Sequence, residues 1–240
     1  ADGFITDLKR KFQQGDIVLR LVYVNVAVFL AVTLVQIFLT LFNVSASPWM
    51  NYLELPAWTE VFIRRPWTLI TYMFMHANFS HIFFNMFAVW MFGRVLEQVW
   101  GPKRFLTYYL ICGIGAGLIQ EVVQYVEYLT VWSNYDSVNT GLGIIPMDAF
   151  LNQLTTVGAS GAVYGILLAF GMLFPNSQMF VFPIPVPIKA KYFVIGYAVL
   201  ELLLGLGSND GVAHFAHLGG MLFGLILIVY WRKKNGGGRI

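Results

Sequence analysis

The chain is poor in charged residues and has almost no cysteine. Asp, Glu, Lys and Arg make up only 11% of its 240 residues, whereas a soluble domain carries about 25%. This excludes a water-soluble globular protein, because most of the surface needs a solvent other than water. Cys112 is the only cysteine; it cannot form an intramolecular disulfide and is interpreted as a small buried hydrophobic residue. The net charge of +3 is too small to indicate nucleic-acid binding.

Apolar residues dominate instead. They make up 58% of the chain, and the mean hydropathy is +0.68. A transmembrane helix needs about 20 mostly apolar residues, and the apolar stretches predict six such spans, the fourth of them ended by Pro175. The spans are placed at residues 20–42, 80–97, 105–127, 157–174, 190–207 and 212–231. The sequence therefore predicts an all-α polytopic membrane protein, a bundle of six transmembrane helices in a lipid bilayer.

The predicted spans divide the chain into three parts. Residues 1–19 form a cytoplasmic amphipathic segment, residues 20–232 the six-span domain, and residues 233–240 a cytoplasmic tail. The first segment suits a helix lying on the membrane surface, with its apolar side chains on one face. The residues of that face are Phe4, Ile5, Leu8 and Phe12. Asp210, just before the sixth span, is interpreted as a helix N-cap.

The positions of the basic residues predict the orientation of the spans. With six spans and a cytoplasmic N-terminus, all 15 lysines and arginines except Arg64 and Arg65 fall on the cytoplasmic side. This distribution follows the positive-inside rule. We therefore expect both termini in the cytoplasm and two long external loops, at residues 43–79 and 128–156.

Polar residues inside the spans cluster at one depth. Buried polar groups are costly in a membrane, so each calls for a functional hypothesis. All four histidines lie near the outward ends of spans two and six, Asn85 lies one turn after one of them, and Ser160 opens span four. The histidines are His76, His81, His214 and His217. Three helices therefore bring polar side chains to a similar level, near the outer surface.

Ser160 lies between glycines at the predicted start of a helix. Gly158 and Gly161 would let a substrate backbone approach the hydroxyl, and the first N–H groups of a helix are available to stabilise an oxyanion. These features are typical of a nucleophile. The alternative is a small-residue packing stripe of Gly158, Gly161 and Gly165, in which Ser160 is incidental. The local pattern alone leaves both interpretations open.

His217 shares a helix face with Gly220 and Gly224, which predict close packing of span six on a neighbour. A serine hydroxyl is a weak nucleophile unless a base removes its proton, and histidine suits that role near neutral pH. A single histidine in a span is more often a packing residue. Together with a glycine-flanked serine, His217 indicates a hydrolytic site.

Four motifs, in this order along the chain, resemble those of the rhomboid family of intramembrane proteases. His76, His81 and Asn85 resemble its HxxxxHxxxN motif. Gly93, Arg94 and Glu97 resemble the family's stretch at the end of span two. Gly158, Ser160 and Gly161 resemble its GxSG motif. Ala216, His217, Gly220 and Gly224 resemble its AHxxGxxxG motif. One departure is Trp67, which is followed by Thr68 where the family often has arginine.

The resemblance implies a Ser–His dyad rather than a triad, with Ser160 as nucleophile and His217 as general base. His81, Asn85 and the Ser160 backbone N–H would form the oxyanion hole. The supporting residues it implies are Tyr164 under the His217 ring, His76 near the site, Glu97 at the cytoplasmic end of span two, and Gly158, Gly161, Gly220 and Gly224 in packing.

The implied function is an intramembrane serine endopeptidase without metal or cofactor. It would cut single-span membrane proteins near the outer face of the bilayer, and we expect it in a bacterial inner membrane. One alternative is a catalytically silent rhomboid-fold protein that binds membrane proteins. A second is a metal or haem site built from the four histidines. Against it, His76 and His81 are five residues apart, a poor spacing for one helix face, and we expect no carboxylate or cysteine to join the histidines. A transporter would use Glu121 or Glu201, each interpreted as a buried hydrogen-bonded acid or an interfacial residue.

Overall fold

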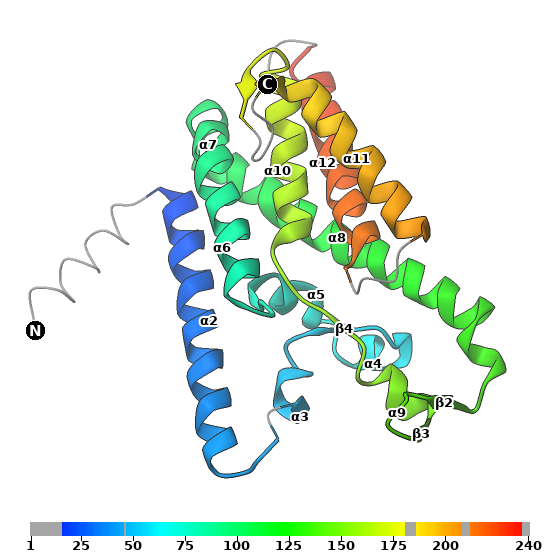
Figure 1. The fold of residues 1–240 in the computed structure, drawn as a ribbon. Helices are drawn as coiled ribbons and strands as arrows, with labels where there is room; N and C mark the ends of the chain where they lie inside the picture. Colours follow the sequence, from blue (N-terminus) through cyan, green and yellow to red (C-terminus); the bar gives the residue numbers. More distant parts are fainter. Residues whose placement is uncertain (1–15, 46, 181–185, 208–211, 237–240) are drawn as a thin grey trace, which may run out of the picture.

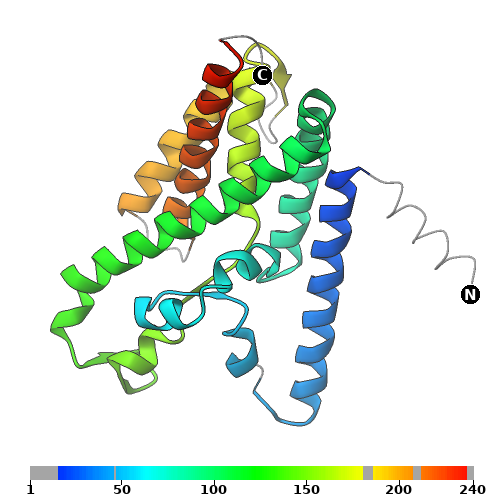
Figure 2. The same ribbon diagram turned by 180° about the vertical axis from the view of Figure 1, so that it is seen from behind.

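A computed structural model describes residues 16–45, 47–180, 186–207 and 212–236. The predicted surface helix at residues 1–19 lies mostly outside these residues, as do Asp210 and the last four residues of the predicted tail. Six apolar helices make up most of the described chain (Figures 1 and 2). Five are long and apolar enough to cross a membrane, and the sixth, at Ser160–Leu173, is shorter. The prediction of an all-α polytopic membrane fold is confirmed.

The helices begin and end close to the predicted spans. The second span is continuous but composite, with a π-helical turn in its middle. The elements of the six spans are α2 (Ile17–Leu41), α6 (Phe79–Ala88) with η2 (Val89–Gly93) and α7 (Arg94–Trp100), α8 (Pro102–Thr130), α10 (Ser160–Leu173), α11 (Ala190–Gly207) and α12 (His214–Lys234). The fourth span ends before Pro175 because proline cannot continue a helix.

Short elements fill the connections. They include three two-stranded antiparallel pairs, of which β1–β4 joins the two long loops, with Leu55 opposite Thr156. The elements are α3 (Ser47–Met50), β1 (Leu55–Pro56), α4 (Thr59–Arg64), α5 (Thr68–Thr71), η1 (Tyr72–Phe74), η3 (Trp132–Asn134), β2 (Ser137–Asn139), β3 (Ile144–Pro146), α9 (Met147–Leu151), β4 (Thr155–Thr156), β5 (Gln178–Met179) and β6 (Ile188–Lys189). Strand β4 leads directly to the start of α10.

Helices α8, α10 and α12 form the centre of the bundle. The long α8 crosses behind α10 and α12, α11 packs beside α12, and α2 runs along α6 (Figures 1 and 2). Buried tyrosines make hydrogen bonds between elements of the bundle. The Tyr108 hydroxyl of α8 donates to the Gly165 carbonyl of α10 at 2.8 Å. Similarly, the Tyr72 hydroxyl donates to the Gly113 carbonyl at 2.5 Å. These bonds satisfy polar groups that neither water nor lipid can reach.

Large apolar side chains also cover the outside of the bundle. Leu34 of α2 is 65% exposed, and Leu203 of α11 is 62% exposed. Helix α2 buries only Val18, Leu21 and Asn25. Such a surface is unfavourable in water but suits the hydrocarbon core of a bilayer.

Charged groups tie the helices together at one end of the bundle. The Glu97 carboxylate accepts hydrogen bonds from the backbone N–H groups of Ile17 and Val18, at 2.8 and 3.1 Å. It therefore satisfies donors that the first turn of α2 leaves without partners inside the helix. The Arg104 guanidinium lies over the Trp231 ring, 4.9 Å from its centroid. Helices α2, α7, α8 and α12 thus meet at this end.

Arg65 anchors the first long loop. Its Nη1 donates to the Asn51 carbonyl at 3.2 Å, and its guanidinium lies 4.0 Å from the centroid of the Tyr52 ring. Trp67 contacts the same segment, because its Nε1 donates to the Tyr52 carbonyl at 2.8 Å. An arginine two residues before Trp67 therefore makes anchoring contacts, although Thr68 follows Trp67 in the sequence.

Candidate active site

Ser160 is the first residue of α10, where the extended chain after β4 turns into a helix. The turn depends on Gly158, whose φ of +123° is unfavourable for other residues. A Cβ atom at Gly158 would also lie 2.6 Å from the His81 ring. The Gly158 N–H donates to the Tyr72 carbonyl at 2.9 Å, which holds the turn in place. Gly158 thus lets the chain pass His81 and present Ser160.

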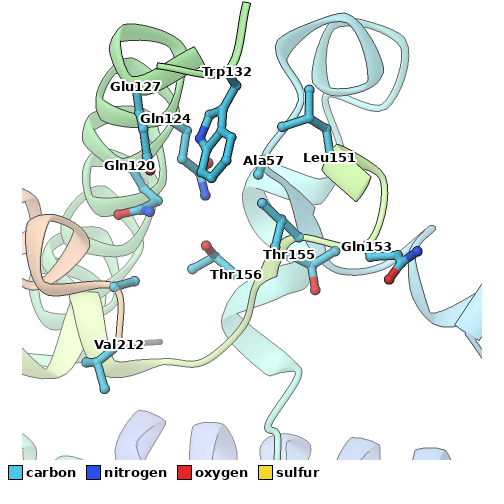
Figure 3. Close-up of a pocket in the computed structure, with 12 residues that line it drawn as sticks. Ala57, Gln120, Gln124, Glu127, Trp132, Leu151, Gln153, Thr155, Thr156 and Val212 are labelled. Carbon is cyan, nitrogen blue, oxygen red and sulfur yellow. The ribbon is translucent and has the colours of Figure 1, made fainter. Parts of the chain in front are cut away.

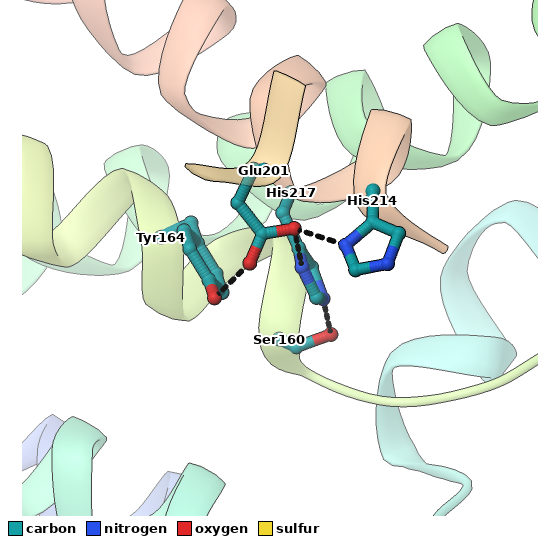
Figure 4. Close-up of polar contacts among 5 residues, drawn as sticks. All are labelled: Ser160, Tyr164, Glu201, His214 and His217. Atoms are coloured by element: carbon teal, nitrogen blue, oxygen red, sulfur yellow. Dashed lines mark hydrogen bonds and ion pairs between the residues drawn. The ribbon is translucent and has the colours of Figure 1, made fainter. Parts of the chain in front are cut away.

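The Ser160 hydroxyl meets His217 across two helices. Ser160 Oγ lies 2.9 Å from His217 Nε2, a hydrogen-bond distance (Figure 4). Close glycine contact sets this separation, because a Cβ atom on Gly220 would lie only 1.9 Å from the Gly161 carbonyl oxygen. Gly161 follows Ser160 directly, and Gly220 lies one turn after His217. The packing stripe and the polar pair are therefore parts of one arrangement.

Tyr164 lies flat against the His217 ring. The ring centroids are 4.2 Å apart, and the planes differ by 8°. Tyr164 is one turn after Ser160 on α10, so both side chains face α12. The stack restricts the plane in which the His217 ring can lie.

Glu201 of α11 is at the centre of the site, as Figure 4 shows. One carboxylate oxygen, Oε2, lies 2.9 Å from His217 Nδ1 and 2.6 Å from His214 Nδ1. The other, Oε1, accepts a hydrogen bond from the Tyr164 hydroxyl. Glu201 is 5% exposed, so it is indeed a buried hydrogen-bonded acid. The expectation that no carboxylate joins the histidines was wrong.

These contacts also change the metal alternative. The donor atoms of Glu201, His214 and His217 lie within 4.8 Å of one another, and such a set could hold a metal ion. Two ligands of one tetrahedral zinc, each about 2.0–2.1 Å from it, are about 3.3 Å apart. The separations of 2.6 and 2.9 Å fit direct hydrogen bonds better. In the described part of the chain, His76 and His81 do not belong to this group.

His81 and Asn85 lie on α6, and the His81 ring faces Gly158, two residues before Ser160. His81 Nδ1 accepts a long hydrogen bond from the Ala77 N–H, at 3.4 Å. A neutral ring then carries its hydrogen on Nε2, the atom beside Gly158. The Asn85 side-chain nitrogen donates one hydrogen to the His81 carbonyl at 3.0 Å and has a second hydrogen. Each of the two side chains therefore has one N–H hydrogen beyond these contacts.

His76 precedes α6 and packs edge-on against His81, with ring centroids 5.1 Å apart. Burial, reinforced by the neighbouring His81, lowers the pKa of His76 to about 4. The His76 ring is therefore neutral at physiological pH and adds no positive charge beside His81.

A polar pocket of about 330 Å³ opens beside the site (Figure 3). It lies between the C-terminal end of α8, strand β4 and the residues before α12. Its polar lining is Gln120, Gln124, Glu127, Gln153, Thr155 and Thr156. The lining includes Ala213, which precedes His214, but neither Ser160 nor His217. The pocket thus lies next to the start of α12 without being the site itself.

A family model described as the rhomboid domain matches residues 64–234, which include every side chain of the site. The chain belongs to the rhomboid family. Helix α2 lies before the matched part of this rhomboid chain. The match also accounts for the polytopic helical fold and identifies the chain as an integral membrane protein.

Curated rhomboid relatives match a similar share of the chain. Rhomboid protease AarA of Providencia stuartii is 32% identical over 169 residues, which are 68% of this chain and 56% of that protein. The putative rhomboid protease YdcA of Bacillus subtilis is 29% identical over 67% of this chain and 65% of its own length. Rhomboid protein 1, mitochondrial, of Saccharomyces cerevisiae is 29% identical over 69% and 42%. The matched part thus spans about half the length of these relatives.

Proposed function

We propose that this rhomboid chain is an intramembrane serine endopeptidase, with Ser160 as nucleophile and His217 as general base. The observation that carries this proposal is the 2.9 Å contact between Ser160 Oγ and His217 Nε2. An activated serine needs a base within hydrogen-bond reach, and this distance meets that requirement. The name of the Providencia stuartii relative, rhomboid protease AarA, supports the same activity.

In the proposed reaction, Ser160 Oγ attacks the carbonyl carbon of a peptide bond while His217 Nε2 takes the hydroxyl proton. The negative charge that forms on the carbonyl oxygen is stabilised by N–H groups of His81, Asn85 and Ser160. His217 then gives its proton to the leaving nitrogen, and an acyl ester on Ser160 remains. Water, deprotonated by His217, hydrolyses this ester and restores the serine.

We propose single-span membrane proteins as substrates, cut near the outer face of a bacterial inner membrane. Two features support this location. Ser160 opens α10 at the end where β4 and the long loops lie, and the basic residues concentrate at the opposite ends of the spans, which the positive-inside rule assigns to the cytoplasm.

The test is Ser160→Ala in liposomes, with a reporter protein that has one transmembrane span. We expect wild type to cleave the reporter and Ser160→Ala to lose cleavage while it still folds. Ser133→Ala, which changes an exposed serine of η3, is the matched control and should keep full activity. A fluorophosphonate probe should label wild type and Ser133→Ala but not Ser160→Ala. Full cleavage by Ser160→Ala would refute the assignment of the nucleophile, and cleavage by none of the three would favour the catalytically silent alternative.

A further inference from the structure

We propose that Glu201 is the positioning residue of this site, holding His217 in the tautomer and orientation that let Nε2 accept the Ser160 proton. This inference rests on the proposed function, because it assigns a role in the same reaction. It changes the site from a pair of residues into a chain of three, Ser160–His217–Glu201. The third member comes from α11, which none of the four sequence motifs includes.

The tautomer follows from the contact between His217 and the carboxylate. Glu201 Oε2 lies 2.9 Å from His217 Nδ1, and an ionised carboxylate can only accept hydrogen bonds. Nδ1 must therefore carry the ring hydrogen, and a neutral imidazole has only one. Nε2 is then the unprotonated nitrogen, and it faces Ser160 Oγ at 2.9 Å. The proton of Ser160 thus has an acceptor in the resting site.

Other residues fix the carboxylate. His214 Nδ1 lies 2.6 Å from the same oxygen, and the Tyr164 hydroxyl donates to the other oxygen. A buried carboxylate is costly unless hydrogen bonds stabilise it, and here three donors reach it. Because Glu201 is held by α10 and α12 together, its position does not depend on α11 alone.

Tyr164 acts on His217 in two ways. Its ring, stacked at 4.2 Å, restricts the plane of the imidazole. Its hydroxyl holds the carboxylate that receives the Nδ1 hydrogen. Stacking alone would allow either tautomer, since both have the same shape. The carboxylate, and not Tyr164, therefore selects the His217 tautomer that carries hydrogen on Nδ1.

Glu201 also has a role while the reaction proceeds. When His217 takes the serine proton, the ring becomes an imidazolium with a carboxylate 2.9 Å away. Both groups are buried, with 8% and 5% of their surface exposed. In such a place a fixed negative charge stabilises the developing positive charge more than it would in water. Glu201 touches neither the peptide bond nor Ser160, so it acts through His217.

The test compares Glu201→Gln with Glu121→Gln. Both changes replace a buried carboxylate of a transmembrane helix by an amide of the same shape, since Glu121 is 6% exposed and Glu201 5%. We expect Glu201→Gln to lower kcat by about 10²–10⁴-fold, with KM changed less than about threefold. The rate of fluorophosphonate labelling should fall as well, because that reaction uses the same base. Glu121→Gln should keep the wild-type kcat.

A second measurement does not depend on the folding of Glu201→Gln. Histidine-selective ¹⁵N NMR of the wild-type protein near neutral pH reports which ring nitrogen carries hydrogen. We expect His217, assigned by its loss in His217→Asn, to carry hydrogen on Nδ1 and none on Nε2. If Glu201→Gln is too unstable to assay, this spectrum alone decides the question.

Two results would overturn the role of Glu201. One is a kcat for folded Glu201→Gln within tenfold of wild type, and the other is a His217 that carries its hydrogen on Nε2. Neither result touches the proposed protease activity, which Ser160→Ala tests separately. Conversely, a wild-type protein that neither cleaves the reporter nor reacts with the fluorophosphonate probe would refute the proposed protease function, whatever the tautomer of His217.

Discussion

Gly220→Ala tests whether the contact between α10 and α12 sets the geometry of the site. A Cβ atom on Gly220 would lie 1.9 Å from the Gly161 carbonyl oxygen and 2.6 Å from its carbonyl carbon. A normal contact between carbon and a carbonyl oxygen is about 3.3 Å or more. The obstacle is backbone, which cannot rotate away as a side chain would. One methyl group therefore forces the two helices apart by about 1.4 Å at this point.

The consequence for the site follows from the positions of Ser160 and His217. Ser160 precedes Gly161, and His217 lies one turn before Gly220, so both move with their helices. A separation of this size lengthens the 2.9 Å contact between Oγ and Nε2 beyond about 3.6 Å, where a hydrogen bond is lost. A misplacement of about 1 Å costs about 100-fold in rate. Overpacking of this kind also lowers the free energy of unfolding by about 1–3 kcal/mol.

The assay is cleavage of a single-span reporter in detergent, together with thermal unfolding of the same samples. We expect Gly220→Ala to lower kcat by about 100-fold and to lower the Tm. Gly196→Ala is the matched control, because a Cβ atom at this position of α11 meets nothing within 4 Å. It should keep full activity and gain stability, as alanine favours a helix over glycine by about 0.8–1.0 kcal/mol. Wild-type kcat and Tm in Gly220→Ala would refute the reasoning.

Two further substitutions test other parts of the structure. Asn85→Ala removes one proposed oxyanion donor and should lower kcat by about 10²–10³-fold, measured with the same reporter; unchanged turnover would exclude Asn85 from the hole. Glu97→Ala leaves the N–H groups of Ile17 and Val18 without their carboxylate acceptor and should lower the free energy of unfolding by about 1–2 kcal/mol. Thermal unfolding of Glu97→Ala is compared with that of Glu60→Ala, a control that changes an exposed glutamate. Equal melting temperatures for the two variants would contradict the anchoring role of Glu97.

The helices could be predicted because the bilayer restricts the sequence so strongly. A span must be long and mostly apolar, and α11 begins and ends where its span was predicted, at residues 190–207. The start of α10 was predicted three residues early, at 157. Gly158 and Ala159 are uncharged and fit the composition of an apolar span. The positive φ of Gly158, however, keeps the chain out of the helix until Ser160.

The connections were harder to predict. Pairing between β1 and β4 joins Leu55 to Thr156, about 100 residues away, through two-residue strands that leave no periodic pattern. The anchoring by Arg65 likewise depends on contacts with Asn51 and Tyr52 rather than on its place next to Trp67. Side-chain contacts of this kind depend on how the loop folds, and the sequence pattern alone does not predict that fold.

The sequence analysis interpreted Glu201 as a buried hydrogen-bonded acid but missed its contact with His217, although the sequence held a signal. Within α10, Ser160 and Tyr164 are four residues apart, and within α12, His214 and His217 are three apart, so each helix presents two polar groups on one face. Tyr164, His214 and His217 all need a hydrogen-bond partner when they are buried between helices. Three convergent donors require an acceptor, and a carboxylate in a neighbouring span is the strongest one. Glu201 of α11 is this acceptor, and it explains why α10 and α12 each place two polar groups on one face.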